Sequence, residues 1–276
     1  IEFFYKNDAL GDPLIHIDEE KWELRNPKNN DFISLIEEFF SLELFEHIKN
    51  QAKFIFLLLE KAFRNSGIIL WDLKLEFGYN MHDSFNHVSP LILADVIDND
   101  SWRITLDGVN LDKQRFRNDT ANRKEILNNY ILVQNITREF VKMADKRNAL
   151  YNPKIYFISD NERETTEAKA VFQQYGYHNY IKHIVKYFDE ETEIFNEIFT
   201  NNFENSIIIC GNTLLQPKLS SVIKHLGHSI IFYPKIHNFR RNETGIEEAV
   251  KEALKYVAQI NPLVYAKLRM EFEEHL

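Results

Sequence analysis

Ionisable and apolar side chains alternate in the segment W-D-L-K-L-E-F-G, which begins at Trp71, and this alternation predicts a β-strand. On an extended backbone Asp72, Lys74 and Glu76 lie on one face, and the apolar residues between them lie on the other. A second strand-like run, L-I-L-A-D-V, contains Asp95. We therefore predict a β-hairpin in which Glu76 and Asp95 lie close enough to share a divalent cation.

Two longer segments repeat apolar residues at steps of three and four, which predicts amphipathic helices. The first follows a polar break at Asn26–Asp31 and runs to Asn65, where the sequence Asn-Ser-Gly stops it. The second covers Asn122–Asn148. Residues 1–13 instead predict a strand that ends in a Gly-Asp-Pro turn. Because the helical pattern breaks after Asn148, we place a domain boundary there.

From Lys154 onward, short apolar runs alternate with amphipathic helical patterns. This alternation predicts an α/β domain with an open, mainly parallel sheet. Sheets of this kind bind ligands at the carboxyl ends of their strands. Those ends are mostly acidic or neutral and almost free of glycine, which makes them poor phosphate sites. The predicted strands are residues 154–158, 181–185, 206–210 and 229–233, and the predicted helices are residues 163–175, 189–200, 216–226 and 245–258, with a last helix from Pro262.

Composition narrows the possible function classes. The net charge of −9 argues against nucleic acid as a general partner, because phosphate binding needs a basic surface. The longest uninterrupted aliphatic and aromatic run, Phe54–Leu59, is far shorter than the roughly 20 residues needed to cross a bilayer, so no membrane span is predicted. One cysteine, Cys210, cannot form an intrachain disulfide. A reducing compartment fits this, and we expect a cytoplasmic protein.

Two clusters of charge have both a structural and a functional interpretation. Lys6, Asp8 and Asp12 suit either a polar turn or a binding site, and turns of this composition are common. The segment D-K-Q-R-F-R, which contains Lys113 and Arg117, suits either the solvated first turn of a helix or a docking site for an anionic phosphate. The close histidine pairs of the second half lack the ligand spacing of a zinc site, so we assign no metal there.

Four motifs resemble those of the SAICAR synthetase family, in the same order. They read Y-K-N-D-A-L-G-D-P at residues 5–13, D-L-K-L-E-F-G at 72–78, L-A-D-V-I-D-N-D-S-W-R at 93–103 and D-K-Q-R-F-R at 112–117. The third motif is most similar to the animal bifunctional enzyme, in which the synthetase is fused to a class II AIR carboxylase. The resemblance implies a SAICAR-synthetase-like α+β domain over residues 1–148 and a three-layer α/β/α, AIR-carboxylase-like domain over residues 149–276.

The resemblance also implies a reaction and its site. The family joins the small molecule CAIR, a carboxylated aminoimidazole ribonucleotide, to L-aspartate with ATP and Mg²⁺ in de novo purine biosynthesis. Phosphoryl transfer needs metal-binding carboxylates that face cationic phosphate clamps. The implied assignments are Glu76 and Asp95 for magnesium, Lys74 and Asp72 for catalysis, and Lys6, Asp12, Arg103, Lys113 and Arg117 for substrate or phosphate.

Two departures from the family pattern leave the activity open. The family's amino-terminal ATP lobe would precede Ile1, and the second domain has Ser159–Glu162 where the family has a serine-rich, glycine-containing phosphate loop. Added carboxylates repel a phosphate, so we predict that carboxylase activity is lost. One interpretation is a SAICAR synthetase whose ATP lobe lies upstream. The alternative is a non-catalytic descendant that serves as a binding, storage or structural protein, and either would allow a homo-oligomer formed through the second domain.

Overall fold

The computed structural model contains two compact units, each with its own internal contacts. The first unit consists of residues 1–53 and 75–95, and the second of residues 54–74 and 96–276. The boundary expected at residue 148 lies inside the second unit and stays a prediction about family domains. The structure describes residues 1–18, 21–35, 42–79, 91–113, 123–145, 151–159, 161–174, 183–187, 206–210, 229–232 and 244–272.

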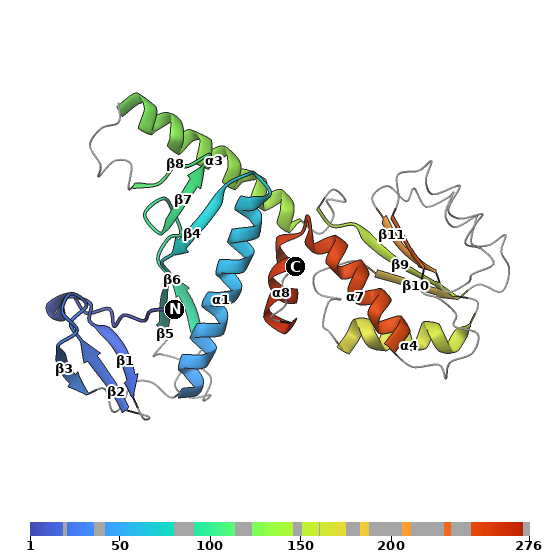
Figure 1. Cartoon of the computed structure of the whole chain (residues 1–276), viewed down its shortest axis with the longest axis horizontal. Coiled ribbons are helices and arrows are strands. Elements are labelled where there is room, and N and C mark those ends of the chain that lie inside the picture. Colours follow the sequence, from blue (N-terminus) through green and yellow to red (C-terminus); the bar gives the residue numbers. More distant parts are fainter. Residues whose placement is uncertain are drawn as a thin grey trace. The chain divides into compact units, whose positions relative to one another are not determined.

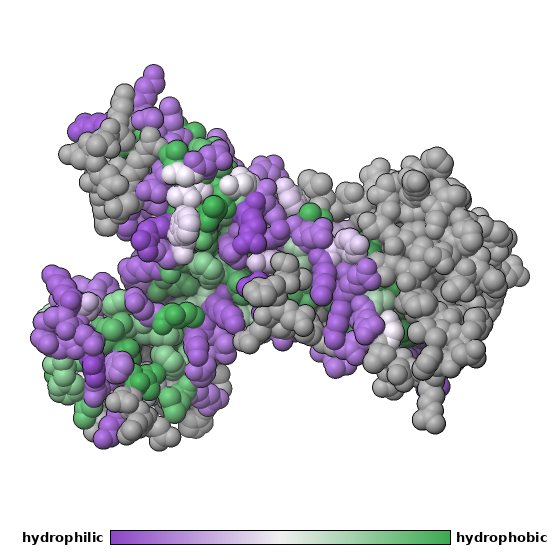
Figure 2. All heavy atoms as spheres, in the orientation of Figure 1, coloured by the Kyte–Doolittle hydropathy of each residue, from purple (hydrophilic) through white to green (hydrophobic). Residues whose placement is uncertain are grey.

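The first unit is built on a three-stranded antiparallel sheet in the order β1-β2-β3 (Figure 1). Trp22 and Leu24 of the middle strand are buried, and the Trp22 ring packs edge-on against Phe45 at the start of helix α1. Apolar side chains are also exposed in this unit, as the green atoms at the lower left of Figure 2 show. The strands are β1 (Leu14–Asp18), β2 (Lys21–Arg25) and β3 (Phe32–Leu35).

Two expectations for this unit are wrong. Residues 1–13 do not form a strand, because only Phe4 makes a β-bridge, to Leu14, and Asp8–Leu10 form a short 3-10 helix, η1. The helical pattern expected from residue 31 begins later, since Phe32–Leu35 pair with β2 and the helix starts at Leu42. The sheet partner, which lies outside the local sequence window, decides the conformation of these four residues.

The expected hairpin around Glu76 forms in part. Strand β5 (Glu76–Tyr79) pairs antiparallel with β6 (Leu91–Ala94), and Glu76 lies opposite Ala94. The strand expected from Trp71 is not continuous, however, because β4 (Ile69–Leu73) ends before Lys74 and pairs with a different partner. The shared face predicted for Asp72, Lys74 and Glu76 therefore does not arise from one uninterrupted strand.

In the second unit β4 pairs with β7 (Trp102–Leu106), and β7 pairs with the short β8 (Val109–Asn110) across a turn at Asp107 and Gly108. The inner face of this sheet forms one hydrophobic core with helix α3 (Arg123–Ala144), which lies within the predicted helical segment. The fully buried members of this core include Phe63 and Ile104, and the Phe63 ring packs edge-on against Trp102.

Helix α1 (Leu42–Arg64) presents two apolar faces in its second half. Phe54, Leu57 and Leu58 belong to the core of the parallel sheet, whereas Phe56, Leu59 and Phe63 belong to the core of the β4-β7-β8 sheet. The helix ends at the expected turn, where the Ile68 amide donates to the Phe63 carbonyl at 3.1 Å and Gly67 adopts φ of +76°. Glycine reaches this left-handed conformation without the strain that a Cβ would cause.

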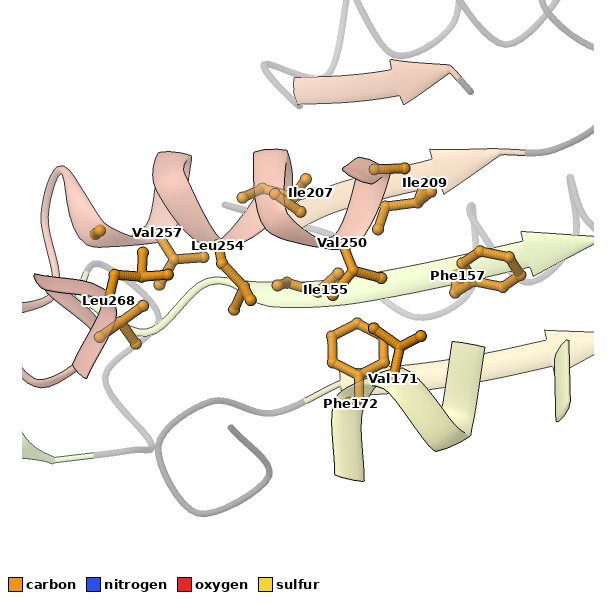
Figure 3. Packing of buried hydrophobic residues seen from close by; sticks show 14 of the residues in the cluster. Ile155, Phe157, Val171, Phe172, Ile207, Ile209, Val250, Leu254, Val257 and Leu268 are labelled. Atoms are coloured by element: carbon orange, nitrogen blue, oxygen red, sulfur yellow. The ribbon is translucent and has the colours of Figure 1, made fainter. Parts of the chain in front are cut away.

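A four-stranded parallel sheet in the order β10-β9-β11-β12 forms the rest of the second unit. Helix α4 packs on β9 and β10, helix α7 packs on β11 and β12, and the two helices contact each other, so both cover one face. Figure 3 shows the core between these helices and the sheet, with Phe172 of α4 and Leu254 of α7 beside Ile155 of β9. The elements are β9 (Lys154–Ser159), α4 (Glu162–Gln174), β10 (His183–Tyr187), β11 (Ser206–Cys210), β12 (Ser229–Phe232), α7 (Thr244–Ala258) and α8 (Pro262–Phe272).

The predicted parallel sheet and the helices α4, α7 and α8 are thus confirmed to within two residues at their starts. The helices expected at residues 189–200 and 216–226 lie outside the described residues, so the three-layer arrangement stays a prediction. The chain is of mixed α/β class, with small antiparallel sheets in addition to the parallel one. Within the described ranges, no helix is both long and apolar enough to span a membrane.

Candidate functional site

Glu76 and Asp95, the predicted magnesium ligands, belong to the same strand pair of the first unit. Since Glu76 lies opposite Ala94, Asp95 occupies the next position after the strand end. Asp95 has φ of +63°, a left-handed conformation that aspartate adopts more readily than most residues and that is uncommon enough to suggest a function. Glu76 shares a face of the strand pair with Ala94, and regular alternation places the following residue, Asp95, on the other face. A magnesium ion shared by Glu76 and Asp95 stays a prediction.

Lys6 and Asp12 lie together at the first loop of the same unit. The Lys6 Nζ lies 3.0 Å from Asp12 Oδ2 and 3.3 Å from Asp8 Oδ1, and the Asn7 amide donates to Asp12 Oδ1 at 2.9 Å. The hydrogen bond from Lys6 to Asp12, followed by the one to Asp8, raises the pKa of the Lys6 amine above its ordinary value. The ammonium group therefore stays charged at neutral pH, which a phosphate or carboxylate ligand requires.

Asp72 and Arg103, predicted separately, form an ion pair across β4 and β7 in the second unit. The Arg103 Nε and Nη2 groups both contact Asp72 Oδ2. The hydrogen bond to Asp72 raises the pKa of the fully charged guanidinium further. The Arg103 side chain is largely open to solvent and the Asp72 side chain is partly so. The pair therefore contributes little to stability on its own and holds the arginine in place on an accessible surface.

A hydrogen-bonded turn at residues 96–101 connects the other predicted groups of this unit. The Asp98 carboxylate accepts from the Asp100 amide at 2.8 Å, and the Ser101 hydroxyl donates to the Val96 carbonyl at 3.0 Å. The Lys74 amide donates to the Ser101 carbonyl at 2.6 Å, which fixes the end of β4 beside the turn. Every one of these bonds orders the loop that leads into Arg103.

Lys113 contacts this turn through its side chain. Its Nζ donates to the Asp100 carbonyl at 2.6 Å and lies 3.9 Å from Asp100 Oδ1. The residue predicted to bind phosphate therefore stabilises the loop in this structure. Arg117, its predicted companion, lies outside the described residues.

The predicted residues are thus divided between the units. The first unit contains Lys6, Asp12, Glu76 and Asp95, and the second contains Asp72, Lys74, Arg103 and Lys113. In the described part of the chain, no group of three or more side chains of the metal-binding type occurs. Magnesium commonly uses one or two carboxylates and takes its other ligands from water and phosphates, so the residue types of Glu76 and Asp95 fit that metal.

Sequence reasoning missed three residues around the 96–101 turn. Asp112 is buried, and its Oδ2 accepts from the Ile104 amide at 2.9 Å. Asn99 is also buried and accepts from Trp102 Nε1 at 2.9 Å. Burial raises the pKa of Tyr130, and Asp100, Asp112 and Asp98 raise it further. Their residue types alone do not mark them, because burial and the folded positions of Trp102, Ile104 and helix α3 give them these roles.

The carboxyl end of β9, where parallel sheets bind ligands, is filled by the chain's own side chains. The fully buried Ser159 hydroxyl donates to Glu164 Oε2 at 2.6 Å, and the Asn161 amide donates to Ser159 Oγ at 3.1 Å. Asn161 Oδ1 in turn accepts from the Arg163 amide at 3.0 Å in the first turn of α4. A carboxylate therefore lies beside the amino-terminal end of this helix.

Comparison with known proteins gives the first part of the chain a family. Residues 1–131 match the family model described as SAICAR synthetase. A phosphoribosylaminoimidazole-succinocarboxamide synthase of Herpetosiphon aurantiacus is 36% identical over 148 residues, which cover 51% of this chain and 51% of that protein. Its counterpart in Roseiflexus sp. strain RS-1 is 36% identical over 121 residues, covering 43% of this chain and 41% of that protein.

A third relative carries a different name. The probable multifunctional protein ADE2 of Caenorhabditis elegans is 34% identical over 161 residues, which cover 54% of this chain and 34% of that protein. The chain thus spans about half the length, or less, of the curated relatives it matches. Residues 1–131 of the chain are thus similar to the SAICAR synthetase family.

Proposed function

We propose that the protein acts in de novo purine biosynthesis as a SAICAR synthetase, which ligates L-aspartate to the carboxylate of CAIR with ATP. The match of residues 1–131 to the family model carries this proposal, and the names of the relatives support it. Amide formation from a carboxylate requires one oxygen to leave, and phosphoryl transfer from ATP provides that leaving group. The chain's own residues then have to bind and orient anionic substrates.

Arg103 is the residue best placed to bind an anion in the second unit. Asp72 occupies the Nε and Nη2 side of the guanidinium, and the arginine side chain is 68% exposed. Its remaining N–H groups suit a carboxylate or phosphate, which arginine binds through two parallel hydrogen bonds. Lys74, fixed through its amide to Ser101, would add a second positive charge on the same unit.

Glu76 and Asp95 would hold magnesium, since both are hard oxygen ligands and Asp95 directly follows Ala94, the ladder partner of Glu76. The metal, when bound, would neutralise negative charge on the ATP phosphates. In the same unit the Lys6 ammonium, held at 3.0 Å from Asp12, would bind substrate or phosphate.

We propose further that the second half of the chain has no carboxylase activity. The Glu164 carboxylate accepts from the buried Ser159 hydroxyl, so the polar groups at the end of β9 are satisfied internally and a phosphate there would meet a negative charge. This half would instead form a homo-oligomer, and the single cysteine agrees with a cytoplasmic location.

SAICAR formation from CAIR, L-aspartate and ATP tests the synthetase, with the natural full-length protein as the sample. We expect turnover with magnesium, and a loss of roughly 10²-fold or more for Glu76→Gln and for Asp95→Asn. Asparagine also tolerates a left-handed backbone, so Asp95→Asn should fold normally.

Asp107→Asn is the matched control, because Asp107 also has a positive φ, of 49°, and is not one of the proposed site residues. It should keep full activity. Absence of turnover in the natural full-length protein would refute the proposed function, and would leave the non-catalytic alternative.

A further inference from the structure

The ladder between β4 and β7 contains one extra residue on the β4 side. Leu70 lies opposite Ile104 and Asp72 lies opposite Arg103, so Trp71 has no partner of its own and forms a β-bulge. Bulges of this kind bend a strand and change the direction of the side chains that follow. The bulge stands immediately before one of the predicted site residues.

The bulge decides which face of the sheet Asp72 occupies. Leu70 and Ile104 are both buried in the core, so strict alternation would place Asp72 on the buried face, opposite Trp102. The extra residue reverses the alternation. Asp72 now lies on the solvent face opposite Arg103, and Leu73 packs against the core opposite Trp102. The Asp72–Arg103 ion pair therefore depends on the bulge.

Trp71 is tied to the neighbouring strand by its side chain. The indole Nε1 donates to the Thr105 hydroxyl at 3.0 Å, although Trp71 is 63% exposed. Thr105 lies opposite Ile69 and two residues from Arg103 along the same face of β7. The hydrogen bond therefore crosses the ladder beside the ion pair. Its donor is Trp71, the bulge residue, which lies opposite no residue of β7.

We propose that Trp71 is a positioning residue, whose hydrogen bond to Thr105 holds the bulge that directs Asp72 at Arg103. This inference rests on the proposed function, because it assigns Arg103 to the anionic group of a substrate. Asp72 takes the Nε and Nη2 contacts and so fixes the plane of the guanidinium. A carboxylate or phosphate then meets an arginine that is already oriented, which improves binding without a new contact.

The test removes the hydrogen bond from each side in the natural full-length protein. Trp71→Phe keeps an aromatic ring without the N–H donor, and Thr105→Val keeps the shape of the side chain without the hydroxyl. Thr105→Ser retains the hydroxyl and should behave as the wild type. Ile69→Ala is the matched control, because Ile69 is an exposed residue of the same strand that lies before the bulge.

The first measurement is the KM for CAIR and for L-aspartate, each varied separately. We expect Trp71→Phe and Thr105→Val to raise the KM of the substrate whose anion contacts Arg103 by about fivefold, the effect of one hydrogen bond, with kcat nearly unchanged. The substrate whose KM rises, CAIR or L-aspartate, is the one that carries the anion bound by Arg103. Thr105→Ser and Ile69→Ala should leave both KM values unchanged.

The second measurement does not depend on activity. In an NMR spectrum, the Arg103 Nε–H proton should exchange slowly with water while Asp72 accepts from it, and faster in Trp71→Phe and Thr105→Val. A protein without turnover but with this change would refute the proposed function and support the positioning role. Unchanged exchange in both variants would overturn the positioning role, and so would unchanged KM values in an active protein.

Discussion

A buried amide, Asn261, is expected to hold together the segment where α3, the following turn and α8 meet. Its Nδ2 donates to the Tyr151 carbonyl at 3.1 Å and to Asn152 Oδ1 at 2.7 Å, and its Oδ1 accepts from the Val264 amide at 3.0 Å. Asn261 is 0% exposed, so water cannot replace these bonds in the folded chain. Asn152 extends the network by donating to the Asp145 carbonyl at 2.8 Å.

Replacing Asn261 by alanine removes three interactions at once. Loss of the helix cap at Val264 costs about 1 kcal/mol, and loss of each of the two buried hydrogen bonds costs about 1 kcal/mol more. We therefore expect Asn261→Ala to lower the free energy of unfolding of the second unit by about 3 kcal/mol. Asn261→Ser keeps an oxygen for the cap and should cost about 2 kcal/mol.

Urea denaturation followed by circular dichroism measures the total loss, and native-state hydrogen exchange of the Val264 amide measures it locally. The double variant Asn152→Ala/Asn261→Ala should be less destabilised than the sum of the single variants, because both changes remove the same bond. A loss below about 1 kcal/mol for Asn261→Ala, or a Val264 amide that exchanges at the wild-type rate, would refute this reasoning.

Two further predictions concern packing and pH. Phe172→Ala should destabilise the second unit by about 3–5 kcal/mol, because the ring is fully buried against the parallel sheet. The control variant Gln173→Ala changes an exposed neighbour and should alter stability by less than about 0.5 kcal/mol. A similar urea midpoint for both variants would contradict this. Burial, followed by the charge of Glu60, raises the pKa of Tyr265 above its ordinary value of about 10. The native state thus retains a proton that the unfolded state loses, so stability should fall as the pH rises above about 10, and Tyr265→Phe should reduce this slope. Phenolate absorbance and urea midpoints along a pH series would show it, and an unchanged slope in Tyr265→Phe would contradict it.

The sequence predicted best the elements whose own residues show a clear pattern, such as a continuous apolar run or a regular apolar stripe. The strands of the parallel sheet read as continuous apolar runs, and β9 is buried on both of its faces, so β9, β11 and β12 were located closely. Helix α7 has a regular apolar stripe and was located equally well. Phe32–Leu35 was assigned to a helix because its apolar residues also fit a helical repeat, and only its pairing with β2 separates the two possibilities.

The candidate site was predictable in residue type but not in arrangement. The motifs identified Asp72 and Arg103, but their contact joins residues 31 positions apart and depends on a bulge that no local pattern shows. Asp112 was missed because its partner, the Ile104 amide, is a backbone group of another strand. Long-range pairing decides which polar residues face one another, and periodicity within one segment carries no information about it.

The two apolar faces of α1 have a consequence for how this protein can be divided or recombined. The family match ends at residue 131, but Leu57 and its neighbours on that helix face pack with β9, α4, α7 and α8, which all lie beyond that point. A fragment that ends at residue 131 would retain helix α1 and expose this apolar face to water. A chimaera with a relative would have to supply a second half whose core packs against that apolar face, and not only a matching cut site.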